Sequence, residues 1–139
     1  MASRSSTDHW SYACLPYFTA ATRPSASIST SAGILSEARR RVSAIYEVVR
    51  SAAGVDTEVG ELWTELSQQR LAGAKEVATL LSRKGGLRSG LSVAQARDII
   101  WVYNDPGLHH ALVGTRRWSQ TKYSDWLAGT LKCQLLGGL

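Results

Sequence analysis

The residues of this chain whose types could perform chemistry are two neighbouring histidines and two cysteines. His109 and His110 are adjacent, so on a helix their side chains point about 100° apart and are poorly placed to chelate one metal ion. Cys14 and Cys133 fit neither a metal-ligand motif nor a disulfide framework. Such cysteine usage is typical of the reducing cytoplasm. We expect Cys133 to be a small buried apolar residue on a helix.

No catalytic constellation accompanies these residues. The sequence has no convincing nucleophile with a base, pair of carboxylates or phosphate-binding loop, and Gly85-Gly86 and Gly90 fit a helix end and a turn. The sequence therefore predicts no catalytic residue, no metal site and no cofactor, and we expect that the chain is not an enzyme.

Composition predicts one globular domain. The chain has 139 residues, 44% hydrophobic and 19% charged, with a formal net charge of +5. The positive charge is scattered, and its densest run, Arg39-Arg40-Arg41, fits a solvated helix face. No segment approaches the roughly 20 apolar residues of a membrane span. We expect a cytoplasmic protein without membrane contact.

The elements that must position these residues are helices. Residues 1–31 are rich in Ser and Thr and lack a helical or strand period, which predicts a poorly ordered leader whose removal leaves the fold intact. Residues 32–139 form the predicted helical domain, where apolar residues recur at spacings of three and four. The expected helices cover about 34–53, 57–84, 92–104, 106–115 and 119–136. The first buries a stripe that includes Ile34, Leu35, Ala38, Val42, Ile45, Tyr46 and Val49.

Polar residues mark the expected helix starts. The predicted N-caps are Ser36, Asp56, Ser92 with Gln95 completing a capping box, Asp105 before Pro106, and Ser119. There is no strand pattern, so the fold class is an all-α bundle of about five helices.

The last helix carries an unusually wide apolar stripe. Its apolar residues spread over about half of the circumference, whereas a surface helix needs only about 100° to face its own core. They are Tyr123, Trp126, Leu127, Leu131, Cys133 and Leu135. Asp125 and Lys132 are expected on the opposite, solvent-exposed face. Such a stripe indicates burial against both the domain and a second chain. The alternative is a centrally placed helix in a monomer. Trp118, just before the cap, is expected to pack over the helix junction in its own subunit.

Several segments together resemble the C-terminal ligand-binding and dimerisation domain of TetR-like transcriptional regulators. The residues that carry the resemblance lie within 61–131. They are LW and QQR (62–70), GLRSGLS (86–92), DIIW with the NDP break (98–106) and the R-W-S-x-x-x-Y-x-x-W-L-x-x-T-L pattern (117–131). Gln120 departs from the proline often found after the capping Ser. Residues 1–31 lack the pattern of the family's helix-turn-helix module, so we expect a truncated regulator without sequence-specific DNA contact of its own.

The resemblance implies a homodimer and a small apolar or aromatic effector. In the family the last two helices form a four-helix dimer interface, which here implies Leu108, Leu112, Tyr123, Leu127, Leu131 and Leu135. The effector pocket lies inside the bundle, and the candidates to line it are Tyr46, Trp63, Trp101, Tyr103 and Asn104. Each ring could equally be core. Two alternatives stay open: a modulator that heterodimerises with a full-length relative, and a small-molecule-binding or enzymatic helical protein unrelated to transcription.

Overall fold

The structure is a computed structural model that describes residues 24–136, without the side chains of 27, 30–32, 34–39, 41 and 42. Most of the predicted leader, with Cys14, lies outside the described residues, as do the side chains of Ile34, Leu35, Ala38 and Val42 in the predicted stripe. Every regular element in 24–136 is helical, which confirms the all-α class. None of the helices described there is long and apolar enough to cross a membrane.

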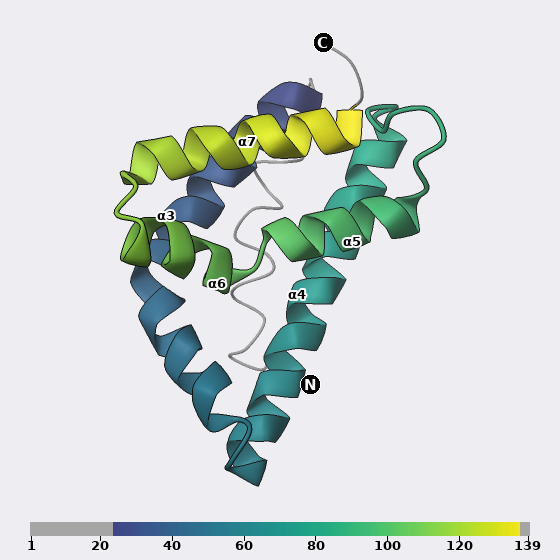
Figure 1. Cartoon of the computed structure of the whole chain (residues 1–139). Helices are drawn as coiled ribbons and strands as arrows, with labels where there is room; N and C mark the ends of the chain where they lie inside the picture. The colour runs from purple at the N-terminus through teal and green to yellow at the C-terminus, as the bar shows by residue number, and fades with distance from the viewer. Residues whose placement is uncertain (1–23, 137–139) are drawn as a thin grey trace, which may run out of the picture.

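Residues 24–136 run through six helical segments. They are α3 (Pro24–Ala52), α4 (Thr57–Arg83), α5 (Val93–Tyr103), α6 (Pro106–His109), the π-helical segment η1 (His110–Thr115) and α7 (Gln120–Leu136). The two long helices, α3 and α4, converge at the turn of residues 53–56 and diverge away from it, so they form the legs of a V (Figure 1). Helix α5 packs across α4, and α7 lies across α3 at the wide end and also contacts α5.

Four of the predicted helix starts are confirmed. Asp56 caps α4 by accepting a hydrogen bond from the Val59 amide at 3.1 Å. Ser92 and Gln95 form the predicted capping box. Asp105 caps α6 ahead of Pro106, and Ser119 Oγ accepts from the Lys122 amide at 3.1 Å at the start of α7. These local hydrogen bonds explain why the boundaries could be predicted from sequence.

The start of α3 differs from the prediction. The helix begins at Pro24, not near Ile34, so Ser36 lies inside it and residues 24–31 are helical. Proline is well suited to a first helical position, and Ile28 is buried in the core at 3% exposure. The Ser-rich sequence here has low helix propensity, but packing of Ile28 overrides it. Ile45, expected in the buried stripe, is instead 65% exposed, because none of the helices in 24–136 covers that side of α3.

Helix α7 is the centre of the core. Tyr123 and Leu127 have no exposed surface, and Leu131 and Leu135 are nearly as buried. This face packs against α3 and α5 of the same chain. The opposite side is wider than predicted: besides Asp125, it exposes Cys133, which corrects the expectation that this cysteine is buried.

The segment between α4 and α5 fixes the end of α7. Gly85 adopts a left-handed φ of 65°, which ends α4. Arg88 then donates from its backbone N–H to the Leu135 carbonyl at 2.8 Å and from Nε to the Gln134 carbonyl at 2.9 Å. A cation at a helix C-terminus satisfies carbonyls that lack partners within the helix. The GLRSGLS segment thus has a structural role.

Candidate ligand-binding site

A partly buried arginine joins three helices at the inner side of the V. Arg70 on α4 donates from Nη1 to the Tyr46 hydroxyl on α3 at 2.8 Å. From Nη2 it donates to the Trp101 carbonyl in the last turn of α5 at 3.0 Å. Nη2 also lies 3.6 Å from Asp105 Oδ2, at the start of α6. One side chain therefore links both legs of the V to the break between α5 and α6.

Aromatic rings surround this guanidinium. Its carbon lies 5.7 Å from the centroid of the Tyr46 ring and 5.3 Å from that of the Trp101 ring, within the range of cation–π attraction. Trp63, two turns before Arg70 on α4, contacts Tyr46 with ring centroids 4.8 Å apart. The arrangement combines flat apolar walls with one cation, which suits recognition of a planar ligand that carries a polar group.

Two donors in this site have no acceptor. Arg70 Nε and Trp101 Nε1 are both buried and make no hydrogen bond. A buried donor without a partner costs about 1–3 kcal/mol, and such groups are few in native proteins. Their presence on two side chains in contact indicates a place where an acceptor atom would be bound favourably.

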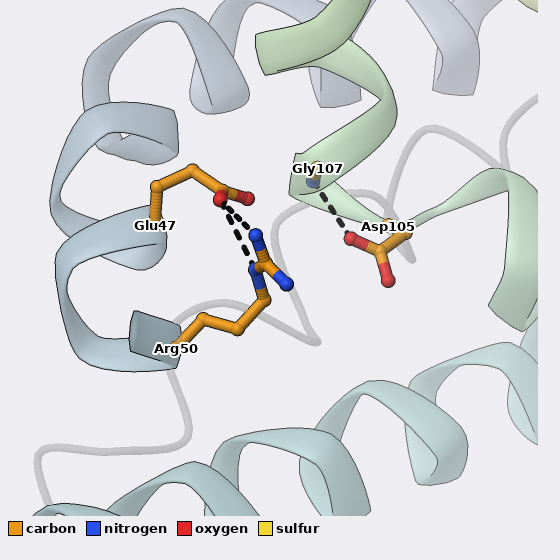
Figure 2. A network of polar contacts seen from close by, with 4 residues as sticks. All are labelled: Glu47, Arg50, Asp105 and Gly107. Carbon is orange, nitrogen blue, oxygen red and sulfur yellow. Dashed lines mark hydrogen bonds and ion pairs between the residues drawn. The ribbon is translucent and has the colours of Figure 1, made fainter. Parts of the chain in front are cut away.

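Beside Asp105, the polar edge of the site carries a second pair of charges. Arg50 and Glu47 on α3 form an ion pair, with Arg50 Nη2 2.7 Å from Glu47 Oε2. Figure 2 shows this pair next to the start of α6, where Asp105 Oδ1 accepts from the Gly107 amide at 2.7 Å. A Cβ at Gly107 would lie 3.0 Å from Asp105 Oδ1 and 3.3 Å from Glu47 Oε1, so these carboxylates would have to shift to admit a side chain. The hydrogen bond from Arg50 to Glu47 raises the pKa of Arg50.

Tyr46 is neutral in this environment. Burial of its hydroxyl raises the pKa of Tyr46, although the charge of Arg70 and the hydrogen bond from it act in the opposite direction. The phenol therefore accepts from Arg70 as a hydroxyl and does not neutralise the guanidinium.

The structure brings together three of the five predicted ligand-site residues. Tyr46, Trp63 and Trp101 meet around Arg70. Tyr103 instead packs edge-on against Trp126 of α7, with centroids 6.2 Å apart. Asn104 forms the C-cap of α5 and is not among the contacts of Arg70.

Arg70 was missed from sequence, although a signal was present. Along α4, Trp63, Leu66, Arg70 and Ala74 recur at helical spacing, so Arg70 occupies a position on the apolar face. A charged residue on a buried stripe requires a partner within the fold. An open hollow elsewhere on α4 is lined by Thr57, Gly60, Glu61, Thr64, Glu65 and Gln68, on a different face of the helix, and does not include Arg70.

The residues expected at a dimer interface are mostly core residues. Tyr123, Leu127, Leu131 and Leu135 are buried within their own chain, and Leu108 and Leu112 are partly buried. The four buried residues are at most 7% exposed, so they pack within their own chain and leave little surface for a second one; an interface through them stays a prediction. The wide stripe on α7 arises because this helix contacts both α3 and α5.

The remaining candidates have structural surroundings. His109 is buried, with Nε2 3.0 Å from Gln120 Oε1 and its ring edge-on to Tyr123, whereas His110 is exposed. Trp118 packs edge-on against Trp126 of the same chain, as predicted, with Lys122 Nζ 4.2 Å above its ring. No group of three or more metal-ligating side chains occurs in the described part of the chain.

Comparison with known proteins identifies no relative. No family model, no curated protein and no solved structure matches this chain.

Proposed function

We propose that the chain is an effector-sensing domain of the kind found in TetR-like transcriptional regulators, and that its effector binds at Arg70. The observation that carries the proposal is the meeting of Tyr46, Trp63 and Trp101 around a partly buried arginine with an unused, buried donor. A regulator of this kind acts in the cytoplasm as a homodimer, and both features belong to the proposal.

The position of the site supports a sensing role. Arg70 holds the end of α5 through the Trp101 carbonyl and lies beside Asp105, which caps α6. A ligand that takes up donors of Arg70 would change the contacts at this helix break. Ligand binding could thus change the orientation of α5 relative to α6.

Tryptophan fluorescence tests the proposal. We expect small apolar or aromatic compounds to change the emission of the full chain and to raise its melting temperature, since a ligand at 100 times its Kd stabilises by about 2.7 kcal/mol. Trp63→Phe or Trp101→Phe should diminish the spectral response. Trp118→Phe is the control, because Trp118 packs on Trp126 away from Arg70. A response that depends on Trp118 and not on the other two would refute the proposed site.

A further inference from the structure

We propose that the Arg70 site recognises its ligand through a carboxylate, so that the ligand class is a small acid with a planar apolar body. The inference rests on the proposed function, because it names the chemistry of a ligand for the same site. Three observations carry it: the unused donors, the ion pair between Arg70 and Asp105 that lacks a hydrogen bond, and the exposure of the site at Asp105.

Arg70 has more donors than it uses within the fold. A guanidinium carries five N–H groups, and the hydrogen bonds to the Tyr46 hydroxyl and the Trp101 carbonyl occupy Nη1 and Nη2. The Nε–H is buried without an acceptor, and so is the indole N–H of Trp101, the ring over which the guanidinium lies. A carboxylate supplies two oxygens that only accept, which matches this surplus of donors.

Arg70 forms an ion pair with Asp105, but this pair contains no hydrogen bond. Asp105 Oδ2 lies 3.6 Å from Nη2, beyond hydrogen-bond length, and the other oxygen of Asp105 is engaged by the Gly107 amide. Tyr46 contributes a neutral hydroxyl. An anionic oxygen would form a shorter, charge-assisted hydrogen bond with the guanidinium, and the fork geometry of arginine fits a carboxylate.

The polar end of the site lies at the surface and its walls are flat, whereas the two unused donors are buried. The side chains of Arg70 and Asp105 are 13% and 39% exposed, so the polar end meets solvent beside α6. The rings of Tyr46 and Trp101 lie close to the guanidinium, with Trp63 against Tyr46. Aromatic faces favour a planar apolar body behind the carboxylate.

Calorimetric titration of the full chain with a matched acid and amide tests the inference. At neutral pH and low salt we expect 1-naphthoate to bind about tenfold more tightly than 1-naphthamide, because the charge-assisted hydrogen bond is lost in the amide. Arg70→Gln should abolish this preference. Arg97→Gln, which removes a cation paired with Asp98 on α5, should preserve it.

A second variant separates charge from folding. Asp105→Asn keeps an oxygen that can cap α6 but removes the competing negative charge. It should tighten binding of the acid severalfold and leave binding of the amide unchanged. If Arg70→Gln fails to fold by circular dichroism, Trp101→Phe replaces it, since it deletes one donor while keeping a ring, and should weaken the acid more than the amide.

The outcomes distinguish the two proposals. If the amide binds as tightly as the acid, or if the preference for the acid survives Arg70→Gln, the inference of a carboxylate ligand is refuted. The proposed sensing function is not affected by either result. If only neutral compounds bind, and their binding depends on Trp63, the carboxylate inference is likewise refuted and the sensing function is not. If neither probe binds, and a broad set of aromatic compounds does not bind either, both the carboxylate inference and the proposed function are refuted.

Discussion

Arg70 shows how one side chain can serve both the fold and the site. It satisfies the Tyr46 hydroxyl and a carbonyl at the end of α5, yet retains a buried N–H without an acceptor. Replacing it with an apolar residue of similar length removes both hydrogen bonds and leaves their acceptors inside the protein. Its structural contribution is therefore measurable apart from any ligand.

We expect Arg70→Met to lower the free energy of unfolding by about 1–3 kcal/mol, the cost of leaving buried polar groups unpaired. Arg97→Met is the matched control, because its ion pair with Asp98 lies at the surface and exposed pairs contribute about 0–1 kcal/mol. Urea denaturation measures both. Equal losses in the two variants would mean that Arg70 has no special structural role.

The raised pKa of Tyr46 predicts a loss of stability at alkaline pH. An unfolded phenol ionises near pH 10.0, whereas the folded one ionises at higher pH because it is buried. Above pH 10.0 the folded state thus holds a proton that the unfolded state has lost, and stability falls as the pH rises. Tyr46→Phe should lower the free energy of unfolding by about 1 kcal/mol at pH 7. Between pH 9 and 11, however, the free energy of unfolding of this variant should fall less than that of the wild type. Tyr103→Phe should decline as the wild type does; parallel pH profiles for all three proteins would contradict the assignment.

Helix ends were predictable from sequence where a local hydrogen bond defines them, as at Asp56, Ser92 and Asp105. The start of α3 was not, because it depends on packing of Ile28 against a core built from residues far along the chain. The same reason applies to the interface predicted on α7. A wide apolar stripe shows how much of a helix is buried, but it does not show whether the covering surface belongs to the same chain.

Two isoleucines of α3 test its revised boundary. Ile28 is 3% exposed and Ile45 is 65% exposed. Ile28→Ala should lower the free energy of unfolding by about 2–5 kcal/mol, as for other buried aliphatic truncations, and Ile45→Ala by less than about 0.5 kcal/mol. Correspondingly, removal of residues 1–31 should destabilise the domain more than removal of 1–23. If Ile28→Ala leaves the free energy of unfolding unchanged, the result would favour the shorter helix that the sequence predicts.

The buried face of α7 gives a further test at this scale. Leu127 is fully buried, so Leu127→Asp places a charge in the core, and an unpaired buried charge costs several kcal/mol. We expect loss of the cooperative melting transition rather than a folded monomer. Asp125→Lys on the exposed side should melt as the wild type does. A folded, monomeric Leu127→Asp protein would show that Leu127 lies at an interface after all.

At the scale of the whole molecule, any second copy must bind to surface that the fold leaves uncovered. Among the side chains that the structure describes, the large apolar ones that remain exposed are Ile45, Val48, Val55, Leu62 and Val102. Ile45 and Val48 are three residues apart on α3, so they share one face of the helix. The homodimer that forms part of the proposed function therefore has a more suitable surface on α3 than on the buried stripe of α7.

Light scattering of a charged variant tests this surface. A stable dimer buries about 1,200–2,000 Å² with apolar anchors near its centre. If Ile45 and Val48 supply such anchors, the double variant Ile45→Glu, Val48→Glu should shift the mass from two chains to one, because two copies would bring like charges together in a desolvated contact. Its melting transition should stay cooperative, since both side chains are largely exposed at 65% and 69%.

Thr64→Glu, an exposed substitution on α4, is the control and should keep the dimer mass. A wild type of single-chain mass at every concentration would contradict the homodimer, whereas a dimer that persists in the double variant would move the interface to another face.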